Sequence, residues 1–179
     1  MRTQIFKCIQ GLFESACLEL FDSFNCHIKR EYGLKPDLSH CPIGVIQASS
    51  HDIEICVFIQ IPNTALALSY PLADDSYDVD DDQLEDWLLE IANQLIGRFK
   101  NKLDKHSCHA QMGLPDCKFD TPLKDLMPES ASCFSEYFNV DGEIFGSFIC
   151  VTLLNDKPSF SLEEIKDADV MEEGDIELF

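Results

Sequence analysis

The clearest hydrophobic pattern along the chain lies between Asp82 and Leu103, and it predicts one long amphipathic helix. Apolar residues recur there with helical spacing, so at about 100° per residue they gather in one broad stripe. The stripe consists of Leu84, Trp87, Leu88, Ile91, Ala92, Leu95, Ile96, Phe99 and Leu103. Asp82 and Glu85 are placed as the N-cap of this helix and its reciprocal partner.

Two further helices are indicated by the same kind of pattern. Thr3–Phe24 has apolar residues at helical spacing and should end before the run 32–36, which contains glycine and proline. Thr64–Pro71 fits a short helix opened by Pro62, because proline is tolerated in a first turn. Its alternating apolar residues fit a strand equally well, so periodicity alone leaves this segment open.

Short runs rich in Ile, Val and Phe predict strands elsewhere. Two hairpins are expected, Ile43–Ser49 with Ile53–Ile61 and Cys133–Val140 with Ile144–Leu154. The first turns at His51-Asp52, and the second turns at Asp141-Gly142, a dipeptide typical of tight hairpin loops. His106–Leu114 is predicted as a single strand that ends at Pro115.

The polar side of the long helix carries the most informative residues. Glu90, Asn93 and Gly97 project almost directly opposite the apolar stripe, so a carboxylate and a carboxamide face solvent one turn apart. Glycine in an exposed helix interior costs about 1 kcal/mol relative to alanine. A bare patch beside an acid and an amide therefore indicates a surface that another molecule approaches closely.

This helix resembles the motif helix of the CheC/CheX/FliY family of chemotaxis phosphatases, which carries Glu-x-x-Asn on an exposed face. The matching residues are Glu90-Ile-Ala-Asn93, with further similarity in Gly44-Val-Ile and Gly113-Leu-Pro115. The N-terminal helix offers only Glu14-Ser-Ala-Cys17, with no Asn, so the resemblance points to the single-motif CheX-like branch.

The resemblance covers about Ile5 to Leu154 and implies an α+β fold, in which an antiparallel β-sheet packs against helices. It also favours a helix for Thr64–Pro71. We therefore expect a single CheX-like domain over residues 1–154. Residues 155–179 are expected to form an acidic C-terminal tail that is partly disordered.

The same resemblance implies an activity. Proteins of this family hydrolyse the aspartyl phosphate of the response regulator CheY, which brings its own Mg²⁺ and a lysine near the phosphoryl group. By motif position, Asn93 would orient the attacking water and Glu90 would pair with that lysine, while Gly97 would leave room for the partner. The chain would bind no cofactor itself, and it would form a homodimer.

Two other interpretations stay open at this level. The chain could be a non-catalytic interaction module that binds a receiver domain or another signalling partner. It could also be an unrelated acidic protein whose resemblance is accidental. A phosphatase requires Asn93 for turnover, whereas a binding module requires only the surrounding helix face.

Charge and cysteine content indicate which classes of partner and which cellular compartment to expect. The 179 residues contain 13 Lys and Arg against 33 Asp and Glu, a formal net charge of −20, which argues against nucleic-acid and anionic-membrane partners. A basic patch around Lys100, Lys102 and Lys105 could offset repulsion from an acidic receiver domain. The nine cysteines lie singly, and the chain shows no signal peptide or long apolar run. These features favour reduced thiols in a cytoplasm.

The remaining motif candidates are weak. His106-Ser-Cys108-His109 with Cys117 suggests zinc, but the spacing matches no common structural zinc pattern. No cysteine–histidine pair is singled out as a nucleophile, and no glycine-rich phosphate loop or dinucleotide fingerprint is present. We therefore expect no metal site in this chain.

Overall fold

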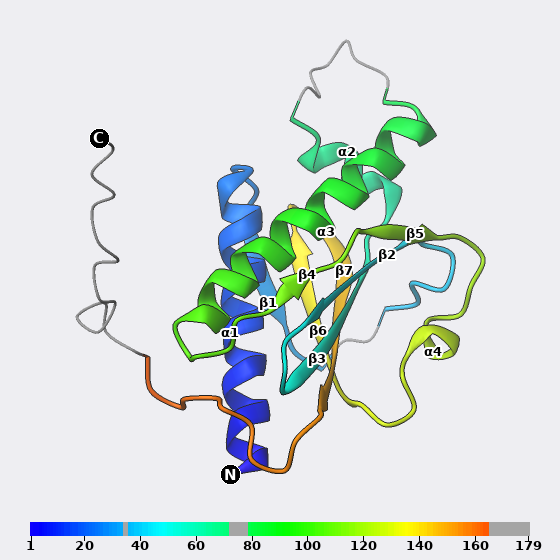
Figure 1. Cartoon of the computed structure of the whole chain (residues 1–179). Coiled ribbons are helices and arrows are strands. Elements are labelled where there is room, and N and C mark those ends of the chain that lie inside the picture. Colours follow the sequence, from blue (N-terminus) through cyan, green and yellow to red (C-terminus); the bar gives the residue numbers. More distant parts are fainter. Residues whose placement is uncertain (34–35, 72–78, 165–179) are drawn as a thin grey trace, which may run out of the picture.

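The computed structural model describes residues 1–33, 36–71 and 79–164, and Figure 1 shows the arrangement of their elements. The helices are α1 (Arg2–Ser23), α2 (Asn63–Ser69), α3 (Asp81–Asp104) and α4 (Leu123–Leu126). The strands are β1 (Ile28–Glu31), β2 (Ile43–Ser49), β3 (Ile53–Gln60), β4 (Gln111–Met112), β5 (Asp116–Lys118), β6 (Ser132–Val140) and β7 (Glu143–Leu153).

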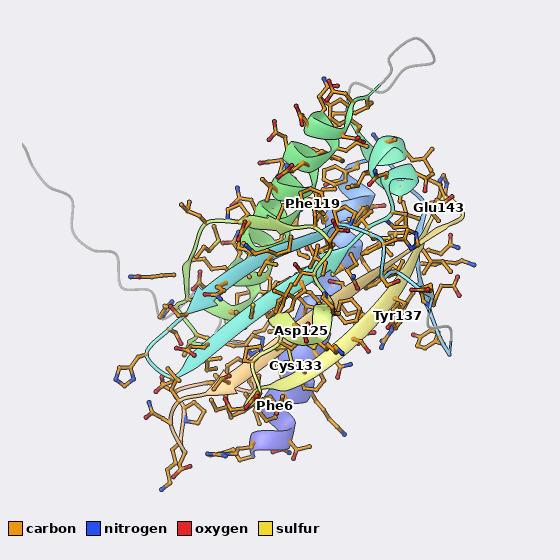
Figure 2. All side chains as sticks on the ribbon, turned by 90° about the vertical axis from the view of Figure 1, so that its right-hand side faces the viewer. Phe6, Phe119, Asp125, Cys133, Tyr137 and Glu143 are labelled. Atoms are coloured by element: carbon orange, nitrogen blue, oxygen red, sulfur yellow. A yellow bond between two sulfur atoms is a disulfide. The ribbon has the colours of Figure 1, made fainter. Side chains whose placement is uncertain are left out.

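One sheet organises these elements. Its strands run in the order β1-β6-β7-β3-β2-β4, with β5 also pairing with β2, and every described pair is antiparallel. The helices α1 and α3 cover one face (Figure 1). The opposite face is crossed by the segment that carries α4, as the turned view in Figure 2 shows around Asp125. The predicted α+β fold with an antiparallel sheet against helices is therefore confirmed.

The main hydrophobic core lies between the sheet and the helices α1 and α3. All nine apolar residues of the predicted stripe on α3 are buried, which confirms the orientation deduced for this helix. Phe13 of α1 meets Phe99 of α3 edge to face, with ring centroids 5.4 Å apart. Burying one large apolar side chain contributes roughly 1.5–3 kcal/mol, so the stripe holds α3 in a single rotational setting.

Both predicted hairpins form, with ends within one residue of those expected. At the second turn Asp141 and Gly142 have positive φ angles of 49° and 101°. Such a turn has the twist that two antiparallel strands require, and glycine adopts it without a steric penalty. The helix expected over Thr64–Pro71 is also confirmed, as α2.

Several local predictions were wrong. The cap of α3 is Asp80, whose carboxylate accepts from the Gln83 backbone N–H at 2.9 Å, rather than Asp82 with Glu85. The strand predicted over His106–Leu114 is reduced to the two residues of β4, because the chain turns at residues 105–107 after α3. The strands β1 and β5 and the short helix α4 were not predicted, since each is too short to show a periodic pattern.

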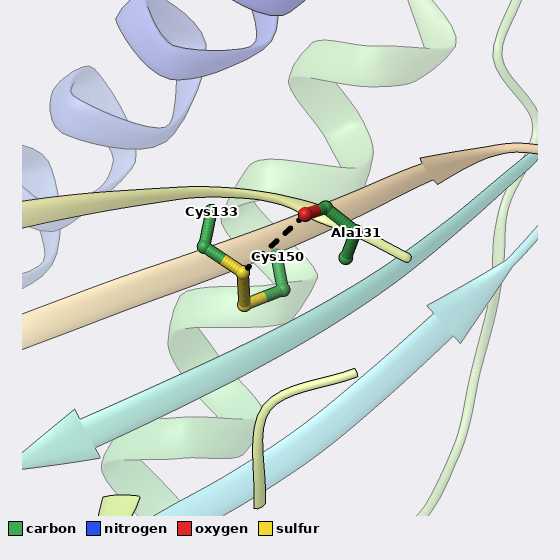
Figure 3. Close-up of a disulfide and its surroundings, with 3 residues drawn as sticks. All are labelled: Ala131, Cys133 and Cys150. Atoms are coloured by element: carbon green, nitrogen blue, oxygen red, sulfur yellow. Dashed lines mark hydrogen bonds between the residues drawn. A yellow bond between two sulfur atoms is a disulfide. The ribbon is translucent and has the colours of Figure 1, made fainter. Parts of the chain in front are cut away.

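The expectation that the thiols are all reduced was also wrong. Cys133 of β6 and Cys150 of β7 form a disulfide, and Figure 3 shows it bridging the two neighbouring strands. It lies on the sheet face opposite α1 and α3, where Cys150 belongs to a second, smaller core with Cys56 and Phe58. The other seven cysteines are free.

The segment that follows β7 returns to the body of the protein. Asp52, in the turn between β2 and β3, accepts from the backbone N–H of Ser159 at 2.9 Å and from its hydroxyl at 2.5 Å. These hydrogen bonds lower the pKa of the Asp52 carboxyl well below its usual range. The His106 ring stacks on Phe160. The predicted tail begins in this segment, and its part beyond residue 164 lies outside the described residues.

No described helix combines the length and the hydrophobicity needed to cross a bilayer.

A charged network ties β1, an edge strand, to α1 and β6. Glu136 is only 2% exposed, and its carboxylate pairs with Arg30 and accepts from Gln10 Nε2 at 2.6 Å. Arg30 also pairs with Glu14 of α1 at 2.6 Å. A buried carboxylate without a cation is strongly destabilising, so Arg30 is required once Glu136 is buried.

Substituting Arg30 by methionine should therefore lower the free energy of unfolding by about 3–5 kcal/mol, because Glu136 would stay buried without its cation. Urea unfolding measured by circular dichroism checks this value. The matched control is Lys29→Met on the same strand. The Lys29 side chain also pairs with a carboxylate, that of Glu31 at 3.2 Å, but it is 70% exposed to solvent. The control should change stability by at most about 0.5 kcal/mol, and an equal loss in both variants would contradict the account.

Candidate functional site

The long helix α3 is held against the sheet by a close approach to β2. An added Cβ at Gly44 of β2 would lie 3.2 Å from the side chain of Leu88, so the absence of a side chain at Gly44 lets the helix pack tightly. At the N-terminal end, the indole N–H of Trp87 donates to Ser69 Oγ of α2 at 3.0 Å. These contacts fix the position and rotation of α3, and with them the direction of its polar face.

The polar face of α3 is exposed where the sequence predicted it to be. Glu90 and Asn93 are both exposed, and an added Cβ at Gly97 would meet nothing within 4 Å. Asp86 and Asn101 are exposed on the same side at helical spacing. We call these five residues, Asp86, Glu90, Asn93, Gly97 and Asn101, the α3 ridge.

The two motif side chains differ in their hydrogen bonding. Glu90 Oε1 accepts from Gln94 Nε2 at 2.7 Å, which holds the carboxylate along the helix and leaves its second oxygen free for another donor. The Asn93 amide has no hydrogen-bond partner within residues 1–33, 36–71 and 79–164. It can therefore both donate to and accept from water or a bound partner.

Charge changes along the ridge. Towards the N-terminal end of α3 lie the exposed carboxylates of Asp82, Asp86 and Glu90, which enter no ion pair with the described part of the chain. Beyond Asn93, Gly97 and Asn101 carry no charge. Asn93 thus lies where a negative surface meets a neutral one. Such a surface would attract a cation on one side of Asn93 and tolerate an anion on the other.

The basic patch expected near the end of α3 is largely neutralised. Lys100 pairs with Asp104 at 2.9 Å, and Lys102 pairs with Glu19 of α1 at 2.6 Å. The hydrogen bond from Lys102 is the main cause of a lowered pKa at Glu19. Lys105 is exposed and enters no ion pair with any residue that the structure describes. Lys102 therefore joins α3 to α1, whereas Lys100 is neutralised within α3 itself.

The other chemical candidates resolve into structural roles. His106 is buried, and its Nδ1 lies 2.8 Å from the carbonyl oxygen of Ser161. Among the described residues, no group of three or more His, Cys, Asp or Glu side chains is placed to hold a metal ion. Nothing in the sequence linked Asp52 to Ser159, because the contact spans 107 positions.

Asp52 also contacts His51, so a serine, an aspartate and a histidine meet at one point. His51 Nδ1 lies 3.0 Å from Asp52 Oδ1, while the Ser159 hydroxyl donates to the other carboxylate oxygen. In a catalytic triad the imidazole lies between the hydroxyl and the carboxylate. Here the carboxylate lies in the middle, so the cluster anchors the segment after β7 and does not activate Ser159.

Comparison with solved structures places this fold among known ones. No protein-family model and no curated protein sequence matches the chain. The crystal structure of the chemotaxis protein CheX from Vibrio vulnificus superimposes with a TM-score of 0.65 at 16% identity, over 80% of this chain and 99% of that one. A CheC-like superfamily protein from Shewanella sp. PV-4 gives 0.66 at 17% identity, over 81% and 97%. The chain has the fold of the CheC/CheX/FliY family.

A third similar structure contains a partner. It is the CheX-CheY-BeF₃-Mg²⁺ complex from Borrelia burgdorferi, which matches with a TM-score of 0.60 at 16% identity, over 79% of this chain and 96% of that one. At this level of identity the comparison confirms the fold predicted from the motif. The assignment to the single-motif CheX-like branch and the roles of Glu90, Asn93 and Gly97 remain predictions.

The open surroundings of Gly97 give a stability test. Gly97→Ala should raise the free energy of unfolding by about 1 kcal/mol, because alanine favours helix and its methyl group meets no neighbour. Gly11→Ala, at an equally open position in α1, should behave in the same way. Thermal and urea unfolding measure both values. A loss of stability in Gly97→Ala would show that the helix is not open at this point.

Proposed function

We propose that this protein is a phosphatase that accelerates hydrolysis of the aspartyl phosphate of a CheY-like response regulator. The observation that carries the proposal is the joint exposure of Glu90 and Asn93, one turn apart on α3, on a fold shared with CheX proteins. The proposal has chemical content because each side chain suits one requirement of the reaction.

The Asn93 amide suits the positioning of water. Hydrolysis of an aspartyl phosphate needs a water molecule placed in line with the breaking P–O bond and charge stabilisation on the phosphoryl oxygens. A carboxamide can accept from and donate to one water at once without a change of protonation. The absence of an intramolecular partner among the described residues leaves the Asn93 amide free for this task.

Glu90 suits the docking of a cationic group. Its carboxylate is oriented by Gln94, and Asp86 adds a second negative charge one turn away. A lysine of the receiver domain would pair with Glu90 on this acidic half of the ridge. The phosphoryl group, which is anionic, would then face Asn93 and the neutral half. The charge change along the ridge therefore gives the docked partner a preferred orientation.

Gly97 suits close approach of the partner. The nearest atoms to an added Cβ at this position lie more than 4 Å away, so the backbone of α3 is open to contact there. A partner that covers Glu90 and Asn93 must also pass over this point, which is one turn further along the helix. In this proposal the glycine is retained for access, at the expense of helix propensity.

The proposal assigns the remaining roles as follows. Mg²⁺ comes with the receiver domain, and this chain binds no cofactor. The protein acts in the cytoplasm as a homodimer of CheX-like subunits. Removal of Mg²⁺ with a chelator should abolish the acceleration, and analytical ultracentrifugation should give twice the mass of the 20.3 kDa chain.

The decisive kinetic test is decay of a phosphorylated CheY-like receiver domain with Mg²⁺, with and without this protein. Wild type should shorten the lifetime of the phosphate. Asn93→Ala should lose about a hundredfold of the acceleration while still binding the partner, because a misplaced water costs rate and not affinity. Glu90→Gln should raise the concentration needed for half-maximal effect about tenfold, since it removes one charge-assisted contact.

Controls separate access from chemistry. Gly97→Trp should abolish both binding and acceleration by covering the ridge, whereas Gly11→Trp, on the exposed face of α1, should leave both intact. Binding by wild type without any acceleration would identify a non-catalytic interaction module instead. If Glu90→Ala, Asn93→Ala and Gly97→Trp all behaved as wild type, the ridge would have no part in the function.

A further inference from the structure

Four residues form a straight row across the sheet, on the face opposite α1 and α3. Strand register pairs Gln47 of β2 with Cys56 of β3, Cys56 with Cys150 of β7, and Cys150 with Cys133 of β6. Residues that pair directly in an antiparallel sheet project to the same side, so the four side chains share one face. In Figure 3 the next strand beyond Cys150, on the side away from Cys133, is β3.

The members of this row differ in chemistry and in exposure. Cys133 and Cys150 are joined by the disulfide, with Cys133 exposed to solvent and Cys150 only 1% exposed. Cys56 is a free thiol that packs in the same small core as Cys150. Gln47 lies directly opposite Cys56 in the β2–β3 register, and its side chain acts to lower the pKa of the Cys56 thiol. Gln47, Cys56 and Cys150 all line one cleft of about 420 Å³.

We propose that this row is a thiol–disulfide exchange site in which Cys56 is the nucleophile. The Cys56 thiolate attacks Cys150 Sγ, a Cys56–Cys150 bond forms and the Cys150–Cys133 bond breaks. Cys133 leaves as a thiolate and takes up a proton from solvent, which balances the proton that Cys56 lost. The step is an isomerisation and requires no external oxidant or reductant.

The geometry favours attack at Cys150. Exchange proceeds when the incoming sulfur lies opposite the leaving one, and a row across three strands spaced about 4.8 Å apart places Cys56 and Cys133 on opposite sides of Cys150. The Cα atoms of Cys133 and Cys150 are 4.1 Å apart, which identifies the closer type of antiparallel pair. Cys56 and Cys150 are then a wider pair, with Cα atoms about 5.5 Å apart, a separation that a disulfide spans.

The exchange would change the surface of the protein. The covalent link would move from the β6–β7 pair to the β3–β7 pair, and a free thiol would appear at the exposed Cys133. In a cytosolic protein, disulfides are usually transient and catalytic or redox-sensing. This site is separate from the phosphatase proposed above, because it lies on the other face of the sheet from the α3 ridge.

Gln47 and burial set the rate of the step. Burial raises the pKa of the Cys56 thiol to about 11, and the side chain of Gln47 opposes this shift by stabilising the thiolate. Only the thiolate attacks a disulfide. The exchange rate should therefore rise about tenfold per pH unit from pH 7 and level off as the pH nears the thiol pKa. Gln47 acts here as a positioning residue.

The test begins from protein treated with oxidised glutathione and freed of the reagent. Samples are incubated without oxygen at pH 7, 8 and 9, quenched with acid, alkylated with N-ethylmaleimide and mapped by mass spectrometry without reduction. We expect a Cys56–Cys150 peptide pair with alkylated Cys133, formed about a hundredfold faster at pH 9 than at pH 7. Gln47→Leu should shift this pH profile to higher pH.

Two variants make the test specific. Cys56→Ser should retain Cys133–Cys150 at every pH and time, while Cys117→Ser, on β5, should exchange as wild type does. Absence of the Cys56–Cys150 pair from wild type at pH 9 would overturn the proposal. So would protein in which no Cys133–Cys150 bond is found after oxidation.

Discussion

The burial of one face of α3 is the constraint on which the rest of the structure depends. Nine apolar side chains of this helix enter the core, and a rotation by one residue, about 100°, would expose part of that stripe and bury Glu90 or Asn93. Burying an unpaired carboxylate costs several kcal/mol, so the stripe and the α3 ridge enforce each other. The close packing of Leu88 on Gly44 then sets the height of the helix above the sheet.

The two faces of the sheet consequently present different chemistry. On the helix side, hydrophobic packing holds a polar ridge outward, and basic side chains such as Lys102 join α3 to α1 instead of facing a partner. On the far side, register alone aligns Gln47, Cys56, Cys150 and Cys133. Both arrangements arise from regular spacing, with a period of about 3.6 in the helix and of two in the strands. Neither requires a deep cavity or a bound metal.

The extent to which sequence predicted this structure follows from the range of the interactions involved. The stripe of α3 and the Asp141-Gly142 turn were predicted because both depend on neighbouring residues. The cap was misplaced by two residues, since several aspartates precede α3 and any of them could serve. The Cys133–Cys150 bond was missed although its two strands form the predicted hairpin, because cysteines that lie singly were taken to indicate reduced thiols. The burial of Glu136 beside Arg30 was missed because it depends on the pairing of β6 with β1, a strand far away in the chain. The sequence correctly put Glu90, Asn93 and Gly97 on the outward face of α3, but it did not predict the hydrogen bond from Gln94 to Glu90.

The central claim is that the α3 ridge is the surface that meets a receiver domain. Photo-crosslinking measures this most directly. A benzophenone amino acid replaces Asn101, which lies on the ridge two turns beyond Asn93. In a control protein the same probe replaces the exposed Lys29 on β1. With a beryllofluoride-bound CheY-like receiver domain and Mg²⁺, the account predicts a crosslink from position 101 and none from position 29. A crosslink from position 29 alone, or equal yields from both positions, would contradict it.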